Sequence, residues 1–238
     1  MTNRFNRRRF LAASAAAGAA LDMGADAARA EGATSFSRGA ALNAPQPLPF
    51  DSAKIKGLSE KLLVSHYENN YVGAVKRLNA IAKELATLDF DKAPGFQING
   101  LKREELIATN SMILHEIYFA GLGGGGAGPG AELVQAIDRD FGGFERWRAE
   151  FVSMGKALGG GSGWVILAYD KRGKRLVNSW ASDHTQNIAG GEPLLVLDMF
   201  EHAYQMDFGA KAADYVKIVM EALDWSNADR LYARYSKA

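Results

Sequence analysis

The chain has 238 residues, of which 47% are apolar and 23% are charged, with a formal net charge of +1 and no cysteine. This composition is ordinary for a globular protein of one or two domains. The near-neutral charge gives no electrostatic footprint for nucleic acid, and beyond the N-terminal segment no apolar run is long enough to span a membrane. The lack of cysteine excludes disulfides and thiolate metal ligands.

Residues 1–30 have the form of an export signal. Arg7-Arg8-Arg9 precede an Ala-rich stretch, which ends in the A-x-A pattern Ala28-Arg29-Ala30. The arginines resemble a twin-arginine motif. The alternative, an amphipathic helix, would have a poor core of Ser, Gly and Ala. We therefore predict a twin-arginine-type signal peptide and a periplasmic or otherwise exported protein. Cleavage after Ala30 removes five arginines and two aspartates, which moves the formal charge to −2.

The next part of the chain has mainly helical patterns. Residues 31–49 are small, polar and proline-containing, and predict an extended lead-in. An apolar stripe with spacings of three and four over 57–88 predicts one or two amphipathic helices, and another helix is expected over 102–122. We interpret 50–122 as a helical hairpin domain, which the Gly-rich segment 123–130 follows as a hinge.

After the hinge, helical and strand patterns are mixed. Helices are predicted over 131–138 and 144–158, with strands over 164–169, 175–180 and 193–197 and further helices from about 199. The charged turn at 170–174 allows the second strand to return antiparallel to the first. The fold class is therefore α+β: an N-terminal helical hairpin domain followed by an α/β domain over 131–238 with a small three-stranded antiparallel sheet.

The four histidines and one aspartate are the candidate site residues. His66 and His115 lie among apolar residues of predicted helices, where a single histidine is usually a hydrogen-bonded core residue. Asp198 precedes His202 by four residues, so both side chains share one face if a helix starts near Asp198. The alternative makes Asp198 a helix N-cap and His202 a surface residue.

Taken together, these residues indicate a metal site. Three imidazoles and one carboxylate suit iron or manganese, and zinc is compatible with the ligand types alone. Three nitrogens and one oxygen also leave a position for solvent, which is typical of sites for small-molecule chemistry rather than of closed structural sites.

Four motifs in this order resemble the iron/manganese superoxide dismutases. They are SHY at 65–67, LHEIYF at 114–119, GSGW at 161–164 and LDMFEHAY at 197–204. The resemblance extends from about residue 48 to residue 225. It implies a helical hairpin domain and an α/β domain with one metal ion between them, a homodimer or homotetramer, and conversion of superoxide to O₂ and hydrogen peroxide at a mononuclear Fe or Mn site.

The resemblance also implies individual roles. The metal ligands would be His66, His115, Asp198 and His202. Trp164 would wall the pocket, and Glu201 would reach across a dimer to the matching histidine ligand of the second subunit. His184 lies where family members place a Gln or His that hydrogen-bonds metal-bound solvent, and a His there resembles an iron-using or metal-tolerant branch.

The chain departs from the family pattern at the proton relay. Family members usually have a His four residues after the first ligand, where this chain has Asn70. They usually have the gateway Tyr eight residues after that ligand, where this chain has Ala74. On a regular helix Tyr71 lies about 60° from that position, so it reaches the pocket only if the helix bends or is wound differently. Gln205 replaces a tyrosine that pairs with the missing His, and an Asn70–Gln205 hydrogen bond would restore that link.

Two milder changes keep an apolar wall, since Phe119 and Phe200 stand where tryptophans are common. We therefore predict a working dismutase with an altered proton relay, in which Tyr71 takes the gateway role. Two other readings remain open. One is a metal-binding relative that has lost turnover. The other is a two-His-one-carboxylate iron oxygenase, which the third histidine ligand and the lack of a basic site for an oxo-acid disfavour.

Overall fold

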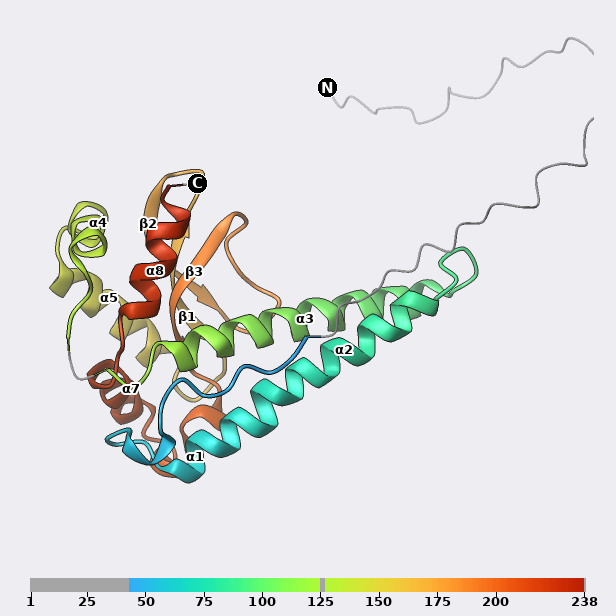
Figure 1. Ribbon diagram of the computed structural model, residues 1–238, viewed down its shortest axis with the longest axis horizontal. Helices are drawn as coiled ribbons and strands as arrows, with labels where there is room; N and C mark the ends of the chain where they lie inside the picture. Colours follow the sequence, from blue (N-terminus) through green and yellow to red (C-terminus); the bar gives the residue numbers. More distant parts are fainter. Residues whose placement is uncertain (1–42, 125–126, 238) are drawn as a thin grey trace, which may run out of the picture. The chain divides into compact units, whose positions relative to one another are not determined.

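The computed structural model describes residues 43–124 and 127–237 (Figure 1). The predicted signal peptide at 1–30, most of the lead-in and two residues of the glycine hinge lie outside the described residues. The order of elements confirms the predicted fold class, because helices occupy the first part of the chain and the sheet lies in the second part.

Helices form the first part of the described chain. The helix α1 (Glu60–Ser65) continues through the π-helical stretch η2 (His66–Tyr71) into α2 (Val72–Thr87). Ser59 caps its start, since the Ser59 hydroxyl accepts a hydrogen bond from the Leu62 N–H at 3.1 Å. After a short turn, α3 (Gly95–Ala120) runs back along α2 (Figure 1). No helix in the described ranges is both long and apolar enough to cross a membrane.

Apolar side chains hold α2 and α3 together. Leu78, Ile81 and Leu85 of α2 pack with Ala108 of α3 in a buried cluster at the outer part of the hairpin. Their spacings of three and four place them on one face, as the apolar stripe predicts. Nearer the sheet, the helices join the main hydrophobic core through Leu62 and Leu63, which lie about one helical turn before His66 and are almost fully buried.

Side-chain hydrogen bonds fix the end of the lead-in, before the 3₁₀ turn η1 (Ser52–Lys54), onto these helices. The Asn79 amide accepts from the Asn43 N–H and donates to the Asn43 carbonyl, both at 2.9 Å. The Tyr67 hydroxyl donates to the Gln46 carbonyl at 2.8 Å, and the Gln46 N–H donates to the Tyr71 hydroxyl at 2.7 Å. The described part of the lead-in is therefore closely attached to the first helices.

The second part of the chain places helices around a small sheet. Helices α4 (Ala131–Phe141) and α5 (Phe144–Leu158) precede it. The sheet has the order β2-β1-β3 and is antiparallel throughout, which confirms the predicted sheet. Its strands are β1 (Trp164–Asp170), β2 (Arg175–Ala181) and β3 (Gly191–Asp198). The chain then continues through η3 (Glu201–Ala203), α6 (Gln205–Phe208), α7 (Ala212–Glu221) and α8 (Ser226–Tyr235).

The predicted helix start near Asp198 is wrong. Asp198 is the last residue of β3, and Phe200 is still in an extended conformation before the 3₁₀ turn η3 begins at Glu201. The Asp198 Oδ1 accepts a hydrogen bond from the Phe200 N–H at 2.8 Å. Asp198 and His202 therefore approach each other across a non-helical segment rather than along one helix face.

The start of β1 and the end of β3 meet at one end of the sheet, where the end of β2 also lies. Trp164 pairs with Asp198 on one side and with Ala181 on the other. Gly163, directly before β1, accepts a hydrogen bond from the Met199 N–H at 2.9 Å. Its φ is +138°, and a Cβ there would lie 2.1 Å from the Ala181 carbonyl oxygen. Only glycine fits this position without moving the backbone.

We expect Gly163→Ala to lower the free energy of unfolding by about 2 kcal/mol or more, because the new methyl group meets backbone rather than a mobile side chain. Gly100→Ala is the matched control, since nothing lies within 4 Å of a Cβ at this exposed position in α3. It should raise stability by about 0.5–1 kcal/mol. Urea unfolding measures both values, and equal stability of the two variants would contradict the prediction.

Candidate metal centre

The four predicted ligands come from four elements that are far apart in the sequence. His66 opens η2, His115 is on α3, Asp198 ends β3, and His202 is in η3. One potential ligand atom from each residue lies within 4.8 Å of all the others. The structure therefore brings together the residues that the sequence pattern predicted to converge.

A single carboxylate oxygen is at the centre of this cluster. Asp198 Oδ2 lies 3.1 Å from His66 Nε2, 3.3 Å from His202 Nε2 and 3.5 Å from His115 Nε2. His66, His115 and Asp198 are almost fully buried, whereas the His202 side chain is 26% exposed. The arrangement presents three imidazole nitrogens and one carboxylate oxygen to a common point.

The hydrogen bond of His115 determines which ring nitrogen faces the cluster as an acceptor. His115 Nδ1 lies 2.6 Å from the Ser111 carbonyl oxygen, so Nδ1 carries the proton and Nε2 carries a lone pair. His115 Nε2 is buried and has no hydrogen-bond partner in the described part of the chain. A buried lone pair without a partner is costly, and a metal ion would satisfy it.

The protonation states of the cluster also suit a cation. Burial lowers the pKa of His66, and it lowers the pKa of His115 to about 3. Burial by itself would raise the pKa of Asp198, but the charge and hydrogen bond of His202 and the hydrogen bond of His66 outweigh it and hold this pKa far below its usual range. The buried carboxylate is thus ionised beside the neutral rings of His66 and His115, and metal binding requires ionised carboxylates and neutral imidazoles.

No lysine or arginine within residues 43–124 or 127–237 compensates the Asp198 charge, because its ion-pair partners there are the three histidines. An ionised carboxylate in a dry interior is expensive without a partner of opposite charge. The donor set therefore fits an iron or manganese ion in ligand type, ionisation state and charge.

His184 lies beside the cluster with a fixed tautomer. Its Nδ1 accepts a hydrogen bond from the Trp164 indole N–H at 2.9 Å, so the ring proton is on Nε2. The Asn110 amide donates to the His184 carbonyl at 2.6 Å and fixes the loop backbone onto α3. The ring centroids of His184 and His115 are 6.1 Å apart. His184 is therefore placed next to the cluster as a hydrogen-bond donor.

Aromatic rings enclose the cluster, as predicted for Trp164, Phe119 and Phe200. Trp164 lies edge-to-face against His115 with centroids 5.1 Å apart, and Phe119 contacts His66 at 5.1 Å. Phe200 is stacked between His184 at 4.7 Å and His202 at 5.3 Å. The stack limits the rotation of both imidazoles.

Two buried tyrosines that the sequence analysis missed support the aspartate. The Tyr215 hydroxyl donates to the Asp198 backbone carbonyl at 2.8 Å and lies 3.1 Å from the Tyr118 hydroxyl. Tyr118 directly follows Ile117 in the LHEIYF motif, but no spacing in the sequence connects it to Tyr215, which is 97 residues away. This contact depends on the tertiary fold alone.

A cavity of about 190 Å³ opens beside the cluster. Asn70 and Ala74 line one part of it, and His115, His184 and His202 line another. The position of the usual gateway tyrosine, Ala74, thus does face the same cavity as the candidate ligands. Asn70 faces it too, whereas Gln205 and Glu201 are exposed on the chain surface. No hydrogen bond joins Asn70 to Gln205 within the described chain, so that link stays a prediction between subunits.

Tyr71 occupies a different place from the one predicted. The helix is indeed wound differently here, since η2 is π-helical, but this turns the hydroxyl toward Glu116. The Tyr71 hydroxyl donates to Glu116 Oε1 at 2.8 Å, and burial raises its pKa to about 12. Tyr71 lines a second cavity of about 340 Å³ together with Glu116 and Phe119, and not the cavity beside His184. Its position gives no support to a gateway role.

Comparisons with known proteins agree with this site. Residues 129–231 match the family described as iron/manganese superoxide dismutases, C-terminal domain. The chain is 64% identical over 188 residues to an iron superoxide dismutase of Cupriavidus metallidurans. This alignment covers 79% of this chain and 95% of the relative.

More distant relatives include enzymes of both metals. A manganese superoxide dismutase of Haloferax volcanii is 32% identical over 196 residues, with 81% of this chain and 94% of the relative covered. An iron superoxide dismutase of Aquifex aeolicus is 31% identical over 191 residues, with 77% and 88% covered. The identity, the coverage and the buried donor cluster lead to one conclusion: the chain belongs to the iron/manganese superoxide dismutase family.

Proposed function

We propose that this protein dismutates superoxide at one iron or manganese ion held by His66, His115, Asp198 and His202. The observation that carries the proposal is the convergence of three imidazole nitrogens on the buried, ionised Asp198 carboxylate, with His115 Nε2 lacking any other partner among the described residues. When bound, the metal supplies one-electron chemistry that oxidises one superoxide to O₂ and reduces a second to hydrogen peroxide, with uptake of two protons.

The chain's own residues orient the substrate and supply hydrogen bonds. His184 presents an Nε2–H donor next to the cluster because Trp164 occupies its Nδ1. A neutral donor at this place stabilises negative charge on a small bound oxygen species or on solvent without adding a formal charge. Phe119, Phe200 and Trp164 exclude bulk water from the other sides of the cluster.

We assign iron as the preferred metal. Its support is the 64% identical relative, which is an iron enzyme, and the presence of a histidine at position 184.

Protons reach the site through the cavity lined by Asn70 and Ala74, where no tyrosine restricts access.

The first test replaces the central carboxylate. Asp198→Asn keeps the shape but removes the charge, so we expect at least a tenfold loss of bound iron and of superoxide decay. Asp138→Asn on α4 is the control, because Asp138 is exposed and does not belong to the ligand cluster. Metal analysis and superoxide decay are measured on the same samples. Wild-type protein that holds iron but leaves superoxide unchanged would instead establish the inert relative.

The second test concerns the proton path. Tyr71→Phe removes the hydroxyl that Glu116 and Gln46 share, so we expect the free energy of unfolding to fall by about 1–3 kcal/mol with dismutase turnover unchanged. Ala74→Tyr places a hydroxyl in the cavity beside His184 and should raise turnover at high pH, where proton supply limits the rate. Loss of turnover in Tyr71→Phe protein that keeps its iron would restore the relay role of Tyr71.

We further propose a homodimer, with Glu201 of each chain reaching the His202 ring of the other. Glu201 is exposed beside the partly exposed ligand His202, and Met206 nearby is 48% exposed. Glu201→Gln should weaken association about tenfold, measured by sedimentation at several concentrations, because it replaces the carboxylate that would accept a hydrogen bond from the His202 ring. A monomeric wild-type protein at micromolar concentration would contradict the dimer, and a tetramer would require an additional interface.

Export by a twin-arginine-type signal is proposed from Arg7-Arg8-Arg9 and the A-x-A pattern at 28–30. Fractionation of cells that express the full chain, with Arg7 to Arg9 changed to lysines as the control, tests whether the protein reaches the periplasm.

A further inference from the structure

One arginine gives the cavity beside the metal centre its charge. Arg77 lies on α2 three residues after Ala74, about one helical turn, and both residues line the cavity. His184 and His202 line the same cavity. The Arg77 side chain is 61% exposed, so its guanidinium faces both water and the entrance.

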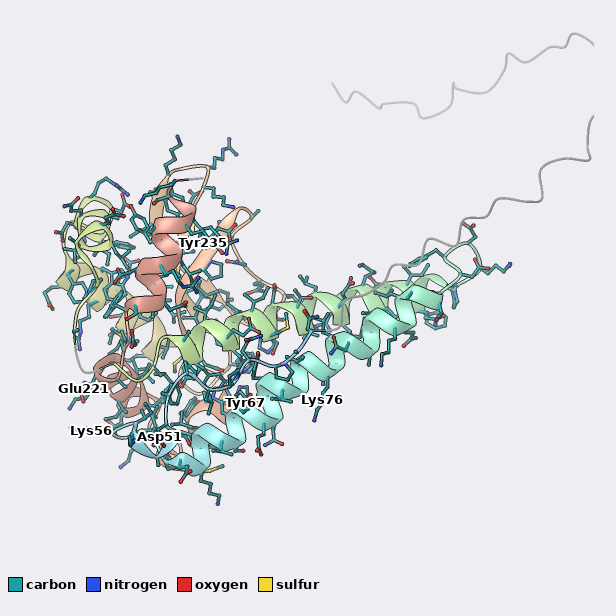
Figure 2. The ribbon with its side chains drawn as sticks, viewed as in Figure 1. Asp51, Lys56, Tyr67, Lys76, Glu221 and Tyr235 are labelled. Atoms are coloured by element: carbon teal, nitrogen blue, oxygen red, sulfur yellow. The ribbon has the colours of Figure 1, made fainter. Side chains whose placement is uncertain are left out.

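No other lysine, arginine, aspartate or glutamate of the described chain lines this cavity. Lys76, the neighbouring cation, projects from α2 away from α3 (Figure 2) and does not line it. The Asp198 carboxylate lies within the imidazole cluster and is fully buried. An anion that enters from solvent therefore meets Arg77 as the charged group of the cavity wall.

The charged groups around Arg77 balance in number, because two arginines stand against the two carboxylates of Glu104 and Asp183. Of these four groups, only Arg77 lines the cavity. Its Nη1 lies 3.5 Å from Glu104 Oε2, and the other oxygen of Glu104 is 3.4 Å from Arg103 Nη1. Two arginines thus share one carboxylate. Asp183 is the nearby acidic group, and its Oδ1 accepts hydrogen bonds from the Thr185 N–H and hydroxyl.

We propose that Arg77 is a steering residue, which draws superoxide into the cavity and thereby raises its rate of association. This inference rests on the proposed dismutase function. Superoxide is a small anion, and the protein after removal of residues 1–30 has a predicted charge of −2, so a local cation has to overcome the overall repulsion. Gly73 and Ala74, which carry no bulky side chain, line the same cavity as Arg77 and His184.

Arg77 is suited to a charge-swap experiment because its ion pair is exposed. An exposed pair of this kind contributes little to stability, so substitutions should leave the fold intact. Arg77→Gln removes the charge, Arg77→Glu reverses it and Arg77→Lys keeps it. Glu104→Gln removes the competing carboxylate and should act in the opposite direction. Arg172→Gln is the distant control, since the β1–β2 turn lies about 20 Å along the strand from Trp164.

Two readouts are measured on iron-loaded protein with equal iron content. The first is kcat/KM for superoxide at several ionic strengths. The second is the association rate of azide, a non-reacting anion of the same charge, followed by absorbance of the iron site. At low ionic strength we expect both values to fall about two- to fivefold in Arg77→Gln and further in Arg77→Glu. Arg77→Lys and Arg172→Gln should match wild type, and the differences should fade as salt rises.

Wild-type values of both readouts in Arg77→Glu at low ionic strength would overturn the proposal. A loss that persists at high salt, or that Arg77→Lys shares, would also overturn it, because it would show a role in shape rather than in charge. The azide readout does not depend on turnover. If the wild-type protein failed to dismutate superoxide, the proposed function would fail while azide association would still decide the role of Arg77.

Discussion

The buried carboxylate of Asp198 is the constraint on which the rest of the site depends. Three imidazole nitrogens lie within 3.5 Å of its Oδ2, yet in their neutral form they cannot cancel its charge. Its Oδ1 and its backbone carbonyl are each occupied by another hydrogen bond, from the Phe200 N–H and the Tyr215 hydroxyl. Both carboxylate oxygens and the backbone carbonyl of Asp198 thus have hydrogen-bond partners. Its negative charge has no cationic side chain beside it, so a metal cation is the missing component.

Sheet register places the ligand and its surroundings together. Trp164 and Asp198 are direct cross-strand partners at one end of the strands, so the strand pairing that positions the carboxylate also positions the indole. Trp164 in turn contacts His115 and fixes the tautomer of His184. A slip of one residue would turn Asp198 to the opposite face of the sheet and remove both relations at once. Gly163 contributes here because its backbone lies too close to Ala181 for any side chain.

The sequence was sufficient for the elements and for the identity of the four converging residues. Periodicities of 3.6 and 2 revealed the helices and strands, and His66 and His115 stood out as polar residues on apolar faces. It was insufficient where geometry departs from regular periods. The π-helical winding of His66–Tyr71 does not change the spacing of apolar residues, so the direction of Tyr71 was not visible. The turn after Asp198 resembles a helix start in sequence, and the Tyr118–Tyr215 contact links positions with no shared pattern.

The cavity beside the cluster separates two tasks that a single gateway side chain could otherwise combine. Where Ala74 stands, a tyrosine would both restrict access and carry a proton, whereas here the side chain at this position is small and uncharged. With the small side chain at this position, the proposed steering by Arg77 acts on an anion that enters the cavity. Hydrogen bonding depends on His184, whose ring is fixed by Trp164, by Phe200 and by the Asn110 contact to its backbone. The rigid donor ring and the open, cation-bearing entrance are therefore complementary parts of one site.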